Sequence, residues 1–349
     1  MAWEADLFGA KRLTLLASQA DLEAETENLR AVRVAVVAET VTAYADLRVA
    51  EARLHVLDES LTSREETSQI TDWREQAGLA SRLEASQALS SLGQARAGRP
   101  ANEQAATEAR LRLSLLAGEA PGTLVELTAP MPEPAVPAPP ETVTPSIPAE
   151  TLRQRPDVRA AERQLEAAAA RLGAAEAGRY PTLRLTGSLD TRSNDLDELF
   201  DVDSLFANLL AGLTAPIFQS GRITQDIAVR EAQWQQAALA YRSTVLEALS
   251  EVERALVFFH ASRERIEALD DAGQAAAEAA ELADQRYAAG LVDLLSVLDT
   301  ERTLFSLEEQ LVIARGDRLN AFTLLYRALG GGWDSSAKPV VSQEGRSDV

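Results

Sequence analysis

The sequence predicts a mainly α-helical protein in which a long antiparallel coiled-coil hairpin occurs twice and one β-hairpin is added. Three observations support this fold class. The chain repeats itself at a constant offset, two long stretches lack helix-breaking residues, and one short segment changes to the two-residue period of a strand. Aromatic residues make up only 5% of the chain, so small side chains must fill most contacts between the helices.

The repeat appears when the sequence is shifted along itself so that Gly9 falls on Gly221. Two stretches then superimpose without a gap, and Gly118 falls on Gly330. An unbroken correspondence of about 110 residues indicates a duplicated structural unit. Other residues also fall on identical ones: Glu39 on Glu251, Arg53 on Arg265, Arg74 on Arg286, and Ala77-Gly78-Leu79 on Ala289-Gly290-Leu291.

Each copy begins with a stretch that predicts a long helix. Residues 10–77 contain neither glycine nor proline. Residues 222–289 contain no proline and one glycine, Gly273. Apolar residues recur in both stretches at spacings of three and four, which is typical of a coiled coil. A helix over residues 10–77 would be roughly 100 Å long, which favours an elongated molecule over a compact globule.

Each long helix is followed by a glycine that allows a turn, at Gly78 and at Gly290. Return helices are expected over residues 80–117 and 291–329, so that each copy forms a helical hairpin. In the first return helix a kink or a break is expected near three residues: Gly93, Gly98 and Pro100.

A proline-rich connector separates the two copies. Residues 121–148 contain nine prolines, which excludes a helix and leaves two alternatives, a loose linker or a strap laid over the surface. A further helix is expected from about Pro156 to Ala177, where Asp157 lies at the end favoured by negative charge.

A β-hairpin is predicted over residues 181–218, where the period changes. The first strand places Leu183, Leu185 and Leu189 on one face and polar residues on the other. A second, less regular strand is expected over residues 206–218, and the connection between the strands is acidic. Transmembrane β-strands and a soluble hairpin packed on helices share this pattern, so the strands alone leave both readings open.

Charge and composition exclude several functions. The net charge of −20 argues against nonspecific nucleic-acid binding and against a polybasic membrane anchor. The chain has no cysteine, which excludes disulfides and thiol catalysis. The spacing patterns of a metal site, a cofactor loop or a nucleophile–base cluster are not found either. We therefore expect no cofactor, no bound metal and no enzymatic activity.

Several segments carry distinctive runs of residues: WEADLFGAKR (3–12), RPDVRAAERQLEAAAARLGAAEAGRYPTLRLTGS (155–188), TAPIFQSGR (214–222), RYAAGLVDLLSVLDTERTL (286–304) and LYRALGGGW (325–333). Together they resemble the outer-membrane efflux proteins of the TolC/OprM type, in their NodT-like branch. The resemblance covers the chain apart from its C-terminal tail.

The resemblance implies a passive exit duct for drugs or other small molecules in a tripartite efflux system of a Gram-negative bacterium. Its expected form is a homotrimer in which strands from all copies make an outer-membrane β-barrel. The long helices would make a periplasmic α-barrel with an equatorial belt. The implied partners are a periplasmic adaptor protein, an inner-membrane pump of the RND type and outer-membrane lipid. Many members of the family also carry a lipid on a cysteine.

The resemblance also assigns roles to single residues. Asp299 matches an aspartate that rings the pore constriction in relatives, although a solvated acid on a helix face has the same local pattern. Ser296 stands where some relatives carry a second aspartate, which puts a double acidic ring in doubt. Tyr287 matches a tyrosine that latches neighbouring helices, and an ordinary packing role fits it nearly as well. Leu183, Leu185 and Leu189 would face lipid.

The two helix turns are expected to be the periplasmic tips that meet the adaptor protein. A turn glycine is also needed in any helical hairpin, and both roles are compatible. The tip residues are Ala77, Gly78, Leu79 and Ala80 in the first copy, and Ala289, Gly290, Leu291 and Val292 in the second.

The expected organisation is a first repeat over 1–118, an equatorial connector over 119–148, a second repeat over 149–330 and a tail over 331–349. The second hairpin follows residues 149–220, whereas the first follows only residues 1–8. By symmetry, about 64 residues and an export signal would precede Met1, and the chain is expected to be truncated. A soluble coiled-coil scaffold, or a non-functional fragment of the channel, is the alternative.

Overall fold

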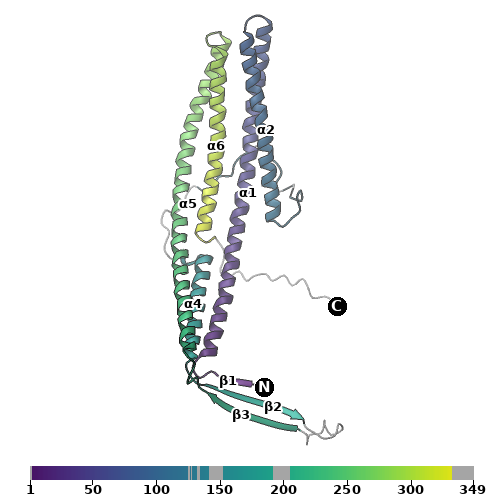
Figure 1. Ribbon diagram of the computed structural model, residues 1–349. Coiled ribbons are helices and arrows are strands. Elements are labelled where there is room, and N and C mark those ends of the chain that lie inside the picture. The colour runs from purple at the N-terminus through teal and green to yellow at the C-terminus, as the bar shows by residue number, and fades with distance from the viewer. Residues whose placement is uncertain are drawn as a thin grey trace. The chain divides into compact units, whose positions relative to one another are not determined.

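The computed structural model describes residues 2–124, 126, 128–131, 134–140, 152–191 and 205–331. The acidic connection between the predicted strands and nearly all of the C-terminal tail lie outside these residues. The elements follow in the order β1 (Ala2–Ala5), α1 (Ala10–Gln76), α2 (Arg82–Leu116), α4 (Pro156–Ala177), β2 (Thr182–Thr191), β3 (Leu205–Thr214), α5 (Arg222–Ala288) and α6 (Leu294–Ala328) (Figure 1).

The helices confirm the hairpins expected from the repeat. Under the shift that places Gly9 on Gly221, both ends of α1 fall on those of α5, and both ends of α2 fall on those of α6. The glycines that end the long helices adopt the same left-handed backbone, with φ of 74° at both Gly78 and Gly290. Only glycine adopts this conformation without strain, so the residues that punctuate the sequence also set the ends of the helices.

Of the kink or break expected in the first return helix, the break is wrong. α2 continues through Pro100, although proline removes one backbone hydrogen bond from a helix interior. Packing on α1 compensates for that loss, because Ala106 and Ala109 on the turns that follow are buried against α1. The side-chain amide of Asn102 also donates a hydrogen bond to the carbonyl oxygen of Gly98 at 3.5 Å.

The second strand is shorter than expected. β3 ends at Thr214, so Ala215 and Ile217 are not part of the strand. Thr214 pairs with Thr182, and that pair is the last of the ladder between the two strands. Pro181 lies directly before Thr182, and Pro216 lies two residues after Thr214. Proline has no N–H group to donate to a ladder, so the pairing ends here.

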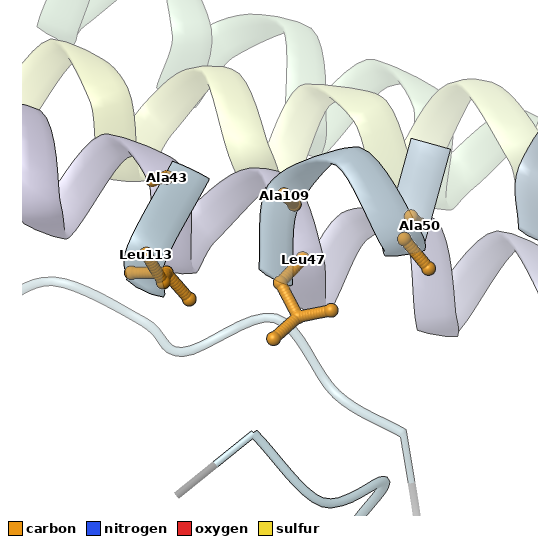
Figure 2. Close-up of a cluster of buried hydrophobic side chains, with 6 residues drawn as sticks. Ala43, Leu47, Ala50, Ala109 and Leu113 are labelled. Carbon is orange, nitrogen blue, oxygen red and sulfur yellow. The ribbon is translucent and has the colours of Figure 1, made fainter. Parts of the chain in front are cut away.

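The chain divides into two compact units that cut across the sequence repeats. One contains residues 1–31 and 152–248, and the other contains residues 32–151 and 249–349. In the second unit α1 packs on α2 through small side chains (Figure 2). This cluster combines Ala43, Leu47 and Ala50 of α1 with Ala106, Ala109 and Leu113 of α2.

α6 packs against α1 in the same unit. A Cβ atom on Gly316 would lie only 2.4 Å from Cγ2 of Val49, so the two helices come too close at this point for any side chain. A Cβ atom on Gly331, just past the end of α6, would lie 2.9 Å from Cγ2 of Val34. The hairpins therefore meet along α1, which contacts both return helices.

The start of the proline-rich connector is held on the surface of α1 and α2. Arg48 and Glu51 form an ion pair at 2.6 Å with side chains only 5% exposed, and Arg110 of α2 reaches the same carboxylate at 2.8 Å. Arg48 donates to the carbonyl oxygen of Ala129 at 3.1 Å, and Arg110 donates to that of Thr128 at 3.4 Å. At these residues the segment is a strap rather than a loose linker.

In the first unit α4 lies against the beginning of α1. Arg171 forms an ion pair with Asp21, and Arg163 pairs with Glu23 at 3.5 Å. Beside these pairs, the Phe8 and Tyr180 rings stack with their centroids 4.6 Å apart. These contacts connect the segment between β1 and α1 to the segment between α4 and β2.

Candidate functional site

The sheet of the first unit has one apolar face that extends over all three strands. β1, β2 and β3 are antiparallel neighbours in that order. Directly paired residues point to the same side, and Leu185 pairs with Trp3 on β1 and with Ala211 on β3. Leu183 pairs in the same way with Ala5 and Leu213. The opposite face carries the polar residues Glu4, Arg184 and Thr186, together with Gly212 and Leu210 of β3.

The apolar face is largely uncovered by the residues that the structure describes. The exposed fractions are 62% for Trp3, 78% for Leu209 and 69% for Leu213. Leu183 and Leu185 are half-buried, whereas the side chain of Leu189 lies outside the described residues. An exposed apolar face on a short sheet is the feature expected of a surface that contacts lipid or another protein.

The tips of both hairpins have the same hydrogen-bond pattern. The N–H group of Leu79 donates to the carbonyl oxygen of Arg74 at 2.7 Å, and Leu291 repeats this bond to Arg286 at 2.9 Å. Gly78 and Gly290 donate to the residues three positions before them. These bonds form the Schellman motif that closes a helix C-terminus. Leu79 and Leu291 are 73% and 74% exposed, and both lie at the outer end of a tip.

The return helices begin with side-chain caps. Ser81 and Glu84 form a reciprocal capping box at the start of α2. At the start of α6, Asp293 accepts hydrogen bonds from the backbone N–H group of Ser296 at 3.0 Å and from its hydroxyl at 2.6 Å. These bonds lower the pKa of Asp293 below its ordinary value. Ser296, proposed from the sequence as a constriction residue, therefore takes part in the cap of α6.

Tyr287 lies beside the tip of the other hairpin. The guanidinium carbon of Arg74 is 4.6 Å from the centre of the Tyr287 ring, a cation–π contact between α1 and α5. Nη1 of Arg74 also donates to the Tyr287 carbonyl oxygen at 3.5 Å. The tyrosine hydroxyl oxygen is buried and has no hydrogen-bond partner within the described residues. Arg74 thus joins the two tips through this tyrosine.

Asp299 lies one turn into α6 with its side chain 62% exposed, and it forms an ion pair with Arg302. Two residues later, Glu301 is only 4% exposed. Successive residues of a helix are about 100° apart, so these two carboxyl groups point in nearly opposite directions. Glu301 faces α1, where the Ser63 hydroxyl donates to its Oε1 at 2.5 Å. Asp299 faces away from this contact.

The predicted site residues fall into two groups, one in each compact unit. Tyr287, Ser296, Asp299 and the tips belong to the second unit, and the strand leucines belong to the first.

Comparison with known proteins shows which family the chain belongs to. The model of the outer membrane efflux protein family matches residues 1–119 and 147–331. The chain belongs to this family.

Individual relatives agree with the family. The chain is 37% identical over 346 residues to outer membrane protein OprJ of Pseudomonas aeruginosa, covering 99% of this chain and 71% of that protein. It is 31% identical over 345 residues to the toluene efflux pump outer membrane protein TtgF of Pseudomonas putida, covering 98% and 71%. The solved structure of the outer-membrane channel OprN matches with a TM-score of 0.90 and 32% identity, over 95% of this chain and 74% of that chain.

This outer membrane efflux protein therefore has the helical-hairpin fold of the efflux channels, and it acts in the outer membrane as a channel component of an efflux system. The family consists of transport ducts rather than enzymes. Among the residues that the structure describes, no helix combines the length and apolar character needed to cross a membrane.

The sequence did not reveal Glu301 or the ion cluster of Arg48, Glu51 and Arg110 as special. Each of these residues has the spacing of an ordinary charged residue on a helix face, and charged residues are usually solvated. Their partners are remote in the chain, since Ser63 and Glu301 are separated by 238 positions. The i, i+3 spacing of Arg48 and Glu51 is the one local signal, and it is common on solvated helices.

Proposed function

We propose that this chain works as a homotrimer that forms a passive exit duct for small molecules, within a tripartite efflux system. Three copies would share one outer-membrane barrel made from their strands and one periplasmic tube made from their helices. The tips would dock on a periplasmic adaptor protein that links the duct to an inner-membrane pump of the RND type. The apolar sheet face would contact lipid through Leu183, Leu185 and Leu189.

The open edges of the sheet support the shared barrel. β1 and β3 each pair on one side only within the described part of the chain. Unpaired backbone groups cannot face lipid, because no water is present there to satisfy them. Strands from other copies would supply the missing partners.

The observation that carries the trimer is the contact of α6 with α1, combined with the repeat. Transferring this contact to the equivalent positions of the repeat predicts that α2 packs in the same way on α5, with α5 supplied by a second copy. The contact of Glu301 with Ser63 then corresponds to one between Leu89 and Ala275. Both residues are exposed in the single chain, and Leu89 is 63% exposed, so a partner surface is available at the predicted place.

Thiol cross-linking tests this arrangement without background, because the chain contains no cysteine. The variant with Leu89→Cys and Ala275→Cys, treated with a short bismaleimide, should give covalent dimers and trimers on a denaturing gel. Each single variant is the control, since three-fold symmetry keeps identical residues apart. If the double variant stays monomeric while the protein remains folded, the proposed packing of the copies is wrong.

The constriction is the second part of the proposal. In a trimer, three copies of Asp299 would face a narrow mouth, and the repulsion between their carboxylates would favour opening unless protons or cations offset it. Tyr287 and Arg74 would hold the two tips of one copy together beside that mouth. Ser296 would act through the cap of α6.

Asp299→Ala should change the conductance and weaken the block by divalent cations in single-channel recordings from planar bilayers. Glu309→Ala provides a control, because Glu309 lies on the same helix and pairs with Arg53 of α1. Conductance and cation block that remain at the wild-type values in Asp299→Ala would remove Asp299 from the constriction.

A further inference from the structure

A buried carboxyl group on α6 is used neither by the tips nor by the proposed constriction. Glu301 is 4% exposed, and its Oε1 accepts the hydrogen bond from Ser63 described above. Its other oxygen, Oε2, is buried and has no hydrogen-bond partner within the described residues. An ionised carboxylate needs several donors when it is removed from water, whereas a neutral carboxyl group needs far fewer. The site is therefore better suited to the neutral form.

The groups around Glu301 come from two other helices. α1 supplies the hydroxyl groups of Ser63 and Thr67 and the guanidinium group of Arg64, and α5 supplies the carboxylate of Asp284. Burial raises the pKa of Glu301, and Asp284 adds to this rise, whereas Ser63, Arg64 and Thr67 oppose it. Asp284 is exposed, so solvent weakens its repulsion.

Arg64 donates its hydrogen bonds to groups other than Glu301, and its guanidinium carbon lies 6.0 Å from the centre of the Phe305 ring on α6. Its guanidinium group donates to the hydroxyl groups of Ser60 at 3.0 Å and Ser91 at 2.5 Å. Arg302, the residue that follows Glu301 on α6, is paired with Asp299. Within the described part of the chain, ionised Glu301 would thus be a buried anion that forms no ion pair and accepts one hydrogen bond, from Ser63, while the charge of Arg64 offsets its burial only in part.

We propose that Glu301 is a proton-controlled positioning residue, which holds α6 against α1 when neutral and loosens this contact when ionised. Asp299 points away from α1 on the same turn of the helix, so any displacement of α6 also moves Asp299. The link to opening of the duct rests on the proposed function. The coupling between protonation and helix packing does not rest on it.

The sign of the pH dependence follows from the raised pKa. The packed form binds the proton more tightly than a form in which Glu301 reaches water, so low pH favours packing. This stabilisation is fully present below the ordinary carboxyl pKa and is lost as the pH rises through the raised pKa of Glu301. Ionisation should therefore weaken the contact of α6 with α1 at higher pH.

Thermal unfolding of the full chain in detergent tests the coupling directly. Glu301→Gln keeps the size of the side chain and the oxygen that accepts from Ser63, but it cannot ionise. Its Tm should equal that of the wild type near pH 4.5 and exceed it by about 2 °C or more near pH 8. Glu309→Gln is the matched control on α6. The difference between its Tm and the wild-type Tm should not increase between pH 4.5 and pH 8.

Ser63→Ala is a second variant, and it removes the hydroxyl that favours the ionised form. It should lose more stability near pH 8 than near pH 4.5. If the differences between the wild type and both variants are the same at the two pH values, Glu301 is an ordinary packing residue and the proposal is overturned.

Bilayer recordings connect the coupling to the duct. The open probability of the wild type should rise with pH, and Glu301→Gln should stay at the low-pH level throughout. A protein that shows the expected Tm pattern but forms no channel would contradict the proposed function and leave the coupling intact. A channel whose Tm difference does not depend on pH would contradict the coupling alone.

Discussion

The two helical hairpins have equivalent helix limits, but they differ in which side chains are buried. Their helices begin and end at equivalent positions of the repeat, and Gly78 and Gly290 have the same φ. Yet Leu89 of α2 is 63% exposed, whereas its counterpart Glu301 of α6 is 4% exposed. The two copies thus share the glycines that end the helices, but they differ in the side chains on the packing faces of those helices. Functional differences between the copies should therefore be sought on these faces.

The clearest divergence lies where the strap is held. The first hairpin buries Arg48 and Glu51 with Arg110, and the second has His260, Arg263 and Phe322 at the same positions. There Phe259 is buried and its ring lies 6.4 Å from that of Phe322. The first copy must satisfy the strap carbonyl groups of Thr128 and Ala129, which explains why it retains charges where the second has an aromatic contact.

Glu51→Ala should give the largest effect among these comparisons. It leaves Arg48 buried without a counter-ion, which should lower the free energy of unfolding by about 3–5 kcal/mol. Its counterpart Arg263 is exposed and pairs with Glu267 on the same helix. Arg263→Ala should therefore change the free energy of unfolding by less than about 0.5 kcal/mol. Thermal or chemical unfolding monitored by circular dichroism measures both values.

The strap offers a second readout for the same substitution. If the ion cluster holds the strap, Glu51→Ala should also speed proteolytic cleavage of the proline-rich connector under native conditions. Equal losses of stability in Glu51→Ala and Arg263→Ala would mean that the two hairpins do not differ in the way their side-chain contacts indicate.

The course of the helices could be predicted because it depends on local chemistry. Glycine and proline mark where a helix cannot continue, and the limits expected for α1, α4 and α5 lie within one residue of those observed. Pro100 shows where local chemistry is overridden, since the packing of Ala106 and Ala109 on α1 outweighs one missing hydrogen bond. The end of β3 depends on pairing with β2, which the period of one strand does not reveal.

The candidate site could be predicted only in part. The positions of the tips followed from Gly78 and Gly290, and the exposed side chain of Asp299 is compatible with the role expected of it. Glu301 could not be singled out, because it is buried against α1, which lies far away in sequence. The spacing of charged residues on one helix does not say which of them another helix will cover.

The contact of α6 with α1 gives the smallest expected effect. Gly316 leaves no room for a side chain beside Val49, and valine has little freedom to move aside. Gly316→Leu should therefore lower the free energy of unfolding by about 1–3 kcal/mol, although leucine favours a helix by up to about 1 kcal/mol over glycine. Its counterpart Gln104 already carries a long exposed side chain, so Gln104→Leu should change little. Equal tolerance of leucine at both positions would show that α6 does not approach α1 closely enough at Gly316 to exclude a side chain.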